Sequence, residues 1–385
     1  MEPIPLTKAP LDTTDKDAVL AALDNPRMEG GGTYSIEAEK LLEKLIGSPC
    51  AMLTNSGTAA LDMAMILANV TSGDEVILPS YTFSSTATSV VLRGATPVFV
   101  DIDQHTYNIC PDAAEAAITD KTKAIIVVHY AGVACDMERF LDLGRRFNLM
   151  IVEDAAHAIG ASWHNHKLGS LGTLAAFSFH ATKNISAGEA GALMVNDERL
   201  IERAEVILEK GTSRRQLIRG KISKYRWVDM GSSFLPSELT AALLLSRLNR
   251  LDEINQSRLA VWNYYAGHPK IQSLLKSGLI EMQTHSPESS HNAHLFCLLL
   301  PTADIRDRLT QKLKSMNISA YHHYLPLHDS PAGQKFGRAS GSLRNTQNIS
   351  DRLIRLPLYS ELRNDQVDFI LEAVHDFLVG EGTGA

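Results

Sequence analysis

The sequence predicts an α/β protein in two parts: a large domain, residues 1–245, built on a mainly parallel sheet, and a smaller α+β domain, residues 246–385. First, short apolar runs alternate with segments of helical periodicity, which is typical of a buried parallel sheet with helices on both faces. Second, this alternation stops after Pro236, where a long helical region extends to about Tyr265 and mixed elements follow. A length of 385 residues agrees with two domains.

The elements of the large domain follow in order from apolar runs and helical spacing. Leu61, Ala64, Met65 and Ala68, for example, recur at the spacing of a helix that begins at the turn before them. The expected strands are residues 51–54, 75–78, 97–100, 123–128, 150–152, 174–179 and 191–195. The expected helices are residues 15–23, the helix after residue 56, and residues 83–92, 137–147 and 200–210.

The smaller domain has less regular patterning, with strands expected near residues 279–282, 294–300 and 318–324 and helices at 303–315 and 365–378.

Composition and charge exclude several classes of function. The formal charge of −7 is spread without long blocks of one sign, which argues against nucleic-acid binding and against a polybasic membrane contact. No apolar run is long enough to span a bilayer, and the N-terminus lacks a signal peptide. The four cysteines lack metal-ligand spacing and indicate no disulfide framework. We therefore expect a soluble cytoplasmic protein with no metal.

The turn Asn55-Ser56-Gly57-Thr58 joins an apolar strand to a helix. Helix N-termini carry unpaired N–H groups and a positive dipole end, and the Ser56 and Thr58 hydroxyls add donors, so this turn is a candidate anion site. The alternative is that Ser56 or Thr58 only caps the helix.

The stretch from Met150 to Lys183 brings ionisable side chains to the ends of two buried strands. One strand ends in Asp154, shortly before His157, and the other contains Ser178 and ends near Lys183. Open α/β sheets bind ligands at this edge. By themselves, an acid and an amine in this arrangement are more often an ordinary ion pair.

Residues 211–233 form the one basic segment that also contains aromatic residues. It is either a solvated loop or a clamp for a phosphorylated ligand, with Arg214, Arg219 and Lys224 among its cations. The triple glycine at residues 30–32 is either a plain loop or a close approach to a ligand.

An anion-binding turn, an aromatic side chain, a carboxylate and an imine-forming lysine match pyridoxal 5′-phosphate, which has a phosphate, a flat ring, a basic ring nitrogen and an aldehyde. At these residues the sequence also resembles the DegT/DnrJ-type nucleotide-sugar aminotransferases, whose fold is the aspartate aminotransferase-like fold type I. The matching stretches, in the family's order, are Asn55-Ser-Gly-Thr-Ala-Ala-Leu61, Pro79-Ser-Tyr-Thr-Phe83, Glu153-Asp-Ala-Ala-His157, Phe177-Ser-Phe-His-Ala-Thr-Lys183, Gly188-Glu189 and His323-Tyr-Leu-Pro-Leu-His328.

The resemblance implies a role for each matching residue. Lys183 is similar to the lysine that joins the cofactor aldehyde and then moves the proton, Asp154 to the partner of the ring nitrogen, and Phe83 and His157 to the residues near the faces of the ring. The implied phosphate ligands are Ser56, Gly57, Thr58, Ser178 and, from a neighbouring subunit, Ser233. The implied substrate-binding residues are Arg214, Arg219, Lys224, Tyr225, Tyr324 and His328, although Tyr324 and His328 could equally be structural.

Three positions depart from the family pattern. Ala190 stands where many members have glycine, and it would be strained if this position needed a positive φ. Ser233 and Leu235 stand where many relatives have an asparagine and an arginine that reach the neighbouring subunit's cofactor.

Within the family, residues 210–233 are most similar to the enterobacterial-type enzymes that make dTDP-4-amino-4,6-dideoxygalactose. The implied reaction moves the amino group of L-glutamate to C4 of a dTDP-4-keto-6-deoxyhexose, in a homodimer with shared active sites. Amination at C3, the C4 epimer, and GDP- or UDP-sugars remain alternatives. A sugar 3-dehydratase would have histidine at position 183, and a silent or regulatory homologue would have no need of Asp154, His157, Ser178 and Lys183 together.

Overall fold

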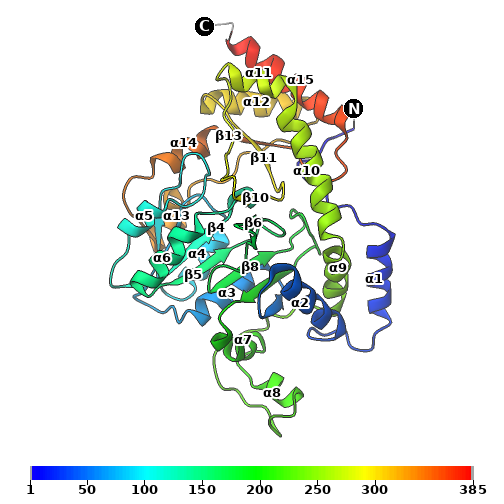
Figure 1. Cartoon of the computed structure of the whole chain (residues 1–385), viewed down its shortest axis with the longest axis vertical. Coiled ribbons are helices and arrows are strands. Elements are labelled where there is room, and N and C mark those ends of the chain that lie inside the picture. The colour runs from blue at the N-terminus through cyan, green and yellow to red at the C-terminus, as the bar shows by residue number, and fades with distance from the viewer. Residues whose placement is uncertain (1, 383–385) are drawn as a thin grey trace.

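An eight-stranded sheet forms the central layer of the computed structural model, which describes residues 2–382 (Figure 1). In spatial order its strands are β1 (Ala51–Thr54), β9 (Gly191–Val195), β8 (Leu174–Ser178), β5 (Met150–Asp154), β4 (Thr122–Val128), β2 (Glu75–Pro79), β3 (Thr96–Val100) and β12 (Arg338–Ala339). β9 pairs antiparallel with both of its neighbours, whereas the other adjacent pairs are parallel. The mainly parallel α/β fold expected from the sequence is therefore confirmed.

The sheet is buried on both faces because its strands alternate between two apolar layers. In β4, Ala124 and Ile126 pack in one hydrophobic cluster with α3, while Ile125 and Val127 pack in another with α6. Such near-continuous apolar strands are typical of a sheet covered by helices on both sides. The helices around it are α2 (Thr33–Ile46), α3 (Gly57–Leu67), α4 (Ser84–Val91), α5 (Pro111–Ala116), α6 (Met137–Phe147), α7 (Ile201–Leu208) and α9 (Glu238–Leu248), with α1 (Thr13–Leu23) packed on α9.

A separate hydrophobic cluster is formed by the C-terminal third of the chain. It begins within α10 at Val261 and also takes in Ile4, whose backbone bridges to Ile318. The division between residues 245 and 246 stays a prediction. The elements of this region are α10 (Leu251–Gly267), α11 (Pro269–Lys276), β11 (Phe296–Leu299), α12 (Ala303–Ser315), α13 (Pro331–Phe336), α14 (Arg344–Arg352), β13 (Leu353–Leu356) and α15 (Asn364–Gly382).

Short elements complete the fold. They are α8 (Arg214–Ile218), β6 (Ser162–Trp163), β7 (His166–Lys167), β10 (Ser289–Ser290) and the 3₁₀ turns η1 (Tyr130–Gly132), η2 (Glu198–Leu200) and η3 (Leu327–Asp329). In Figure 1, α7 and α8 project below the sheet, far from the end that carries α11, α12 and α15. None of the helices in residues 2–382 has the length and hydropathy that crossing a membrane requires.

The structure differs from the expected elements in the large domain, where α2 and α5 were not expected, and more widely in the C-terminal region. The long helical region after Pro236 is two helices, α9 and α10, separated at residues 249–250. The strands expected near residues 279–282 and 318–324 form only isolated bridges, such as Glu281 to Leu299 and Tyr321 to Arg355. β11 pairs instead with β13, a strand that sequence periodicity did not reveal because it has only four residues.

Glu238 occupies the turn made by the triple glycine. Its carboxylate accepts hydrogen bonds from the backbone N–H groups of Gly32, Tyr34 and Ser35 at 3.0, 2.8 and 3.1 Å, and so caps the start of α2. A β-carbon on Gly30 would lie 2.1 Å from the Pro236 carbonyl oxygen. Gly30 and Gly32 therefore serve the packing of α2 against α9, since an added β-carbon on Gly32 would also lie 2.7 Å from the Glu238 carboxylate.

Gly191, at the start of β9, allows the turn before α3 to pack directly on the sheet. A β-carbon at this position would lie 2.4 Å from the Ser56 carbonyl and 2.5 Å from the Gly57 nitrogen. Both neighbours are backbone atoms, which cannot move aside as a flexible side chain would. The position of the Ser56–Thr58 turn therefore depends on the glycine.

We predict that Gly191→Ala lowers the free energy of unfolding by about 1–3 kcal/mol, the usual cost of overpacking a well-packed interior. The matched control is Gly267→Ala at the end of α10, where an added β-carbon meets nothing within 4 Å. That control should leave stability unchanged or slightly raised. Denaturant melts of the two variants test this, and a Gly191→Ala protein as stable as Gly267→Ala would contradict the steric account.

Candidate active site

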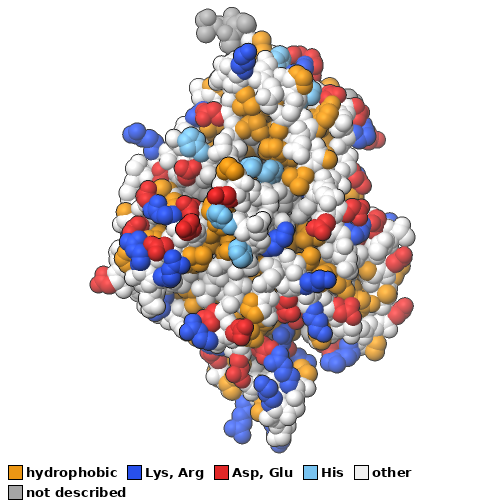
Figure 2. Space-filling model, viewed as in Figure 1, with side chains coloured by type: hydrophobic (Ala, Val, Ile, Leu, Met, Phe, Trp, Pro, Cys, Tyr) orange, Lys and Arg blue, Asp and Glu red, His pale blue; other side chains and the backbone are white. Residues whose placement is uncertain are grey.

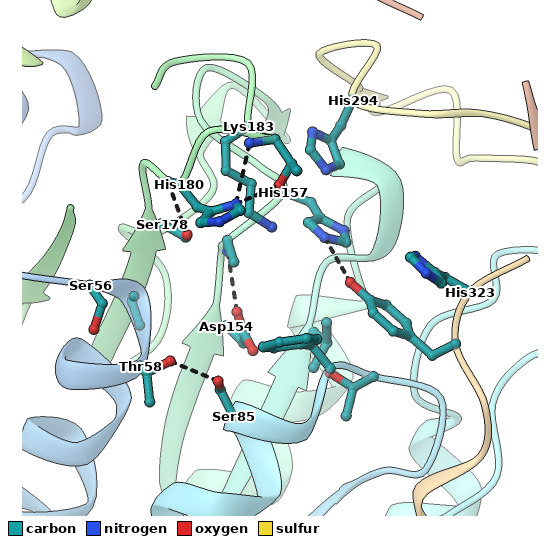
Figure 3. Close-up of a pocket in the computed structure, with 18 of the residues that line it drawn as sticks. Ser56, Thr58, Ser85, Asp154, His157, Ser178, His180, Lys183, His294 and His323 are labelled. Atoms are coloured by element: carbon teal, nitrogen blue, oxygen red, sulfur yellow. Dashed lines mark hydrogen bonds between the residues drawn. The ribbon is translucent and has the colours of Figure 1, made fainter. Parts of the chain in front are cut away.

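A cavity of about 420 Å³ lies at the carboxyl ends of β5 and β8 (Figure 3). This is the sheet edge where α/β proteins place ligands, and the volume suits a small cofactor. The residues expected from the sequence that line it are Ser56, Gly57, Thr58, Phe83, Asp154, His157, Ser178, Lys183 and Tyr324. Others that line it are Thr82, Ser85, His180, Glu189, His294, His323 and Arg355.

One end of the cavity is formed by the N-terminus of α3, the turn that the sequence predicts as an anion site. Ser56 caps the helix by accepting a hydrogen bond from the Ala59 N–H at 3.1 Å, while Thr58 and Ser85 share a hydrogen bond of 2.7 Å between their hydroxyls. Capping and anion binding are compatible here, because the first-turn N–H groups of a helix have no partner within it. Gly57 is needed for the close approach, since a β-carbon there would lie 2.8 Å from Cβ of Ser178.

Asp154 ends β5 in the middle of the cavity and is 5 % exposed. It accepts a hydrogen bond of 2.8 Å from the Thr86 hydroxyl and one of 3.2 Å from the Ala156 N–H. Burial raises the pKa of this carboxyl, against the opposing effects of the Thr86 hydrogen bond and the charge of Lys183. A buried carboxylate of this kind favours a cationic partner such as a protonated ring nitrogen.

Glu153 does not line the cavity, and its hydrogen bonds hold β5 and the neighbouring loop in place behind Asp154. Its carboxylate accepts hydrogen bonds from the His129 ring at 2.9 Å and from the N–H groups of Gly169, Leu171 and Gly172 at 2.8, 2.8 and 2.6 Å. Burial alone would raise its pKa, but the His129 contact and these amides hold it below the usual range. The network ties β5 to the loop that leads into β8.

Lys183 lies in the loop that follows β8 and reaches the same cavity. Burial lowers the pKa of its amine to about 8, with a further lowering from the charge of Arg355 and an opposing effect from Asp154. No ion pair joins Asp154 and Lys183, both of which the structure describes. The ordinary ion pair that the sequence also allowed is therefore not formed. A lysine with this pKa is about half neutral at pH 8 and can act as a nucleophile and base.

His157 is held in one orientation by its neighbours. Its Nδ1 accepts a hydrogen bond of 3.3 Å from the Ala131 N–H, so Nε2 carries the hydrogen and faces the Tyr324 hydroxyl at 3.2 Å. Its ring stacks on His294 with centroids 4.2 Å apart. Burial holds the pKa of His157 well below its usual value, with the charge of Lys183 adding to the effect, so the ring is neutral.

Ala190 is free of the strain considered in the sequence. Positive φ occurs at Gly188, with φ of 80°, whereas Ala190 is not among the residues with positive φ. Ala190 instead packs as a buried residue in the cluster beneath β8 and β9. The alanine is therefore compatible with the loop between Lys183 and β9.

Six residues expected near the ligand do not line this cavity: Arg214, Arg219, Lys224, Tyr225, Ser233 and His328. Arg214 and Arg219 lie on α8 and just after it, where they form ion pairs with Glu209 and Glu205. Ser233 accepts a hydrogen bond from Asn55 through its carbonyl oxygen. His328 Nδ1 lies 2.7 Å from the Ser80 hydroxyl, which ties η3 to the end of β2.

The structure adds residues that the motifs did not identify. His294 donates from Nδ1 to Oδ1 of Asn184, the residue after Lys183, at 2.9 Å. Arg355 lies on the unexpected strand β13, where the only signal in the sequence is one cation inside the apolar run Leu353-Ile-Arg-Leu356.

Comparisons with known proteins identify the family of the chain. Residues 10–375 match the model of the DegT/DnrJ/EryC1/StrS aminotransferase family. GDP-perosamine synthase of Caulobacter vibrioides is 32 % identical over 372 residues, 96 % of each chain. UDP-4-amino-4-deoxy-L-arabinose–oxoglutarate aminotransferase of Shewanella sediminis is 31 % identical over 390 residues, 97 % of this chain and 98 % of its own. The PLP form of the putative sugar aminotransferase Spr1654 from Streptococcus pneumoniae has a TM-score of 0.88 and 26 % identity, covering 98 % of this chain and 99 % of that one.

The chain therefore belongs to the DegT/DnrJ/EryC1/StrS aminotransferase family. Its fold is that of the pyridoxal phosphate-dependent aminotransferases, and pyridoxal phosphate is its cofactor. The residues present fit that group, with an anion site at the start of α3, a buried carboxylate at Asp154 and an amine of lowered pKa at Lys183.

We predict that Lys183 in the apoprotein titrates with a pKa of about 8. Because only the neutral amine reacts, its acylation by a small anhydride should rise with pH and level off above about pH 9, as measured by mass spectrometry with exposed Lys167 as the internal reference. Asp154→Asn removes a charge that raises this pKa and should move the midpoint to lower pH. Reactivity that rises to pH 10 without a break near pH 8 would contradict the assignment.

Proposed function

We propose that this aminotransferase moves the amino group of L-glutamate to the keto carbon C4 of a dTDP-4-keto-6-deoxyhexose, giving dTDP-4-amino-4,6-dideoxygalactose or its C4 epimer. The observation that carries the aminotransferase chemistry is the placement of Lys183 and Asp154 in one cavity without an ion pair between them. The choice of nucleotide and carbon is supported by the similarity of residues 210–233 to enzymes with that product.

The protein's own groups have distinct tasks in this proposal. Pyridoxal phosphate supplies an aldehyde for the amino group and a ring that withdraws electrons. Asp154 holds a proton at the ring nitrogen, and the hydroxyls and N–H groups around Ser56 and Thr58 hold the phosphate. Lys183, partly neutral near pH 8, removes a proton from the carbon that loses the amino group, and in the second half of the reaction it delivers a proton to the sugar carbon that gains the amino group. Phe83, 58 % exposed in the cavity wall, offers a flat apolar surface.

The second candidate function is amination of a GDP- or UDP-linked ketosugar, or amination at C3. Two related proteins favour it through their names, one a GDP-perosamine synthase and the other an aminotransferase of UDP-4-amino-4-deoxy-L-arabinose. Glutamate-dependent turnover of a panel of dTDP-, UDP- and GDP-ketosugars, with NMR assignment of the aminated carbon, separates the candidates. Preference for a GDP or UDP sugar, or an amino group at C3, would replace the dTDP-C4 proposal.

We predict that Lys183→Ala lowers kcat by at least about 10³-fold, since it removes both the nucleophile and the proton carrier. The variant should still bind pyridoxal phosphate through the phosphate site and Asp154, as equilibrium dialysis can show. Lys167→Ala, at an exposed lysine on β7, is the matched control and should keep full activity. Turnover of Lys183→Ala at the wild-type rate would refute the role of this lysine.

We further propose that the protein is a homodimer in which the basic segment, residues 211–233, reaches the neighbouring subunit and brings Arg214, Arg219, Lys224, Tyr225 and Ser233 to its active site. This segment carries exposed apolar side chains, with Trp227 81 % and Ile218 68 % exposed. Lys and Arg side chains gather over the same projection in Figure 2, at the end where α8 lies. Apolar and basic side chains together on a projecting segment suit a contact with another subunit.

We predict that Trp227→Glu weakens the dimer by at least about tenfold in Kd, because it places a charge in a contact that is apolar in the proposed dimer. Sedimentation velocity over a range of concentrations measures this, and activity should fall together with the dimer fraction. Leu20→Glu, at a 59 % exposed leucine on α1, is the control and should leave the dimer intact. An active wild-type monomer at assay concentration would refute the proposal.

A further inference from the structure

Arg355 is a buried cation without a buried anion to match it. It is 8 % exposed, and it lines the cavity from β13. Its Nε is buried without a hydrogen-bond partner, and its NH1 donates to Nδ1 of His323 at 2.8 Å. No carboxylate within residues 2–382 forms an ion pair with it.

The other buried arginines in the described part of the chain have a carboxylate or two backbone carbonyls as partners, although Nε of Arg247 is also buried without a hydrogen bond. Arg247 pairs with Asp15 at 3.1 Å, and Arg306 pairs with Asp307 at 2.8 Å. Arg258 donates to two backbone carbonyls at 3.1 and 2.9 Å. Taking a cation out of water costs several kcal/mol unless a partner compensates it. The free protein therefore bears a cost at position 355 that an anion bound in the cavity would offset.

The end of the cavity near Arg355 is electrically positive. The charge of Arg355 contributes to the lowered pKa of Lys183, His157 and His323, although burial is the larger cause in each. The carboxylates lining the cavity are Asp154, which is held by Thr86, and Glu189, which is exposed at the rim. Neither neutralises Arg355, so the site is suited to an anionic group carried in by the ligand.

The proximity of Arg355 to the amine of Lys183 indicates which ligand anion it would bind, the carboxylate of the amino acid or the diphosphate of the nucleotide sugar. The phosphate end of the cavity, at Ser56 and Thr58, lies across Asp154 and Lys183 from His323, the hydrogen-bond partner of Arg355 (Figure 3). In an amino acid the carboxylate is one bond from the carbon that reacts, whereas a nucleotide sugar has its hexose ring between the diphosphate and the keto carbon. An anion near Lys183 is therefore better supplied by the amino acid.

We propose that Arg355 binds the α-carboxylate of the amino donor and of the 2-oxo acid product. The planar guanidinium can donate two parallel hydrogen bonds to a carboxylate, which fixes the orientation of the α-carbon as well as adding charge. The inference rests on the proposed function only in taking glutamate as the donor, since every α-amino acid offers the same carboxylate. Arg355 is thus a donor-binding residue outside the motifs that identify the family.

The test is the glutamate half-reaction of the cofactor-loaded protein, followed by the change in cofactor absorbance at increasing glutamate. Arg355→Gln should raise the apparent Kd for glutamate about 30-fold or more, as expected for a lost charged hydrogen bond in a buried site, while the KM for the nucleotide sugar changes by less than about twofold. Arg355→Lys should recover part of the lost glutamate affinity, because lysine keeps the positive charge but lacks the two parallel donors of the guanidinium. Arg352→Gln, at the last residue of α14 just before β13 and paired with Glu281 at 2.8 Å, is the matched control and should leave both constants unchanged.

Two further readouts separate this role from a structural one. Calorimetric titration with glutarate, a dicarboxylate without an amino group, should show binding to the wild-type protein and none to Arg355→Gln. The thermal midpoint of Arg355→Gln should equal or exceed that of the wild type, whereas Arg258→Gln should melt lower because it removes partners from two buried carbonyls.

Several outcomes would overturn the proposal. They are an unchanged glutamate Kd in Arg355→Gln, an effect confined to the nucleotide sugar, or a thermal midpoint as low as that of Arg258→Gln. If the wild type reacts with glutamate but aminates none of the ketosugars, the sugar assignment fails while the half-reaction still tests Arg355. If the wild type reacts with a different amino acid, that amino acid replaces glutamate in the same measurement.

Discussion

Asp154 and Lys183 share one cavity without pairing, and the arrangement of the site follows from that constraint. Opposite charges in a medium of low polarity attract strongly, so keeping them apart requires each to be held by other groups. Thr86 and the Ala156 N–H hold the carboxylate, while the loop after β8 positions the amine. The space between the two side chains suits a molecule that presents a basic nitrogen to the Asp154 carboxylate and an electrophilic carbon to the Lys183 amine.

The separation of Asp154 and Lys183 depends on the sheet and on the hydrogen bonds behind it. β5 and β8 are adjacent and parallel, so their carboxyl ends meet at one edge of the sheet. Behind them, Glu153 ties β5 to the loop that enters β8 through three backbone N–H groups, and His129 completes the network. Gly191 allows the start of α3 to lie against the same edge. The start of α3, the carboxylate of Asp154 and the amine of Lys183 thus share one rigid support.

The sequence was sufficient for the parts of the site that depend on local patterning. Asp154 and Ser178 could be assigned to strand ends because the apolar runs before them are short and clear, and the start of α3 followed from one turn and its helical spacing. Arg355 could not be found in this way, because its strand has four residues and pairs with β11 far away in the sequence. His294 likewise enters the cavity from a distant loop. The ion pairs of Arg214 and Arg219 with glutamates on α7 and just after it depend on how the segment folds back, which periodicity does not encode.

The central claim is that Lys183, and no other amine of the chain, combines with the cofactor aldehyde while Asp154 addresses the opposite side of the ring. Borohydride reduction of the protein loaded with pyridoxal phosphate, followed by peptide mapping, measures this directly. The account predicts one phosphopyridoxyl group per chain, on the peptide that contains Lys183. A label on another lysine, or no label on a protein that has bound the cofactor, would contradict it.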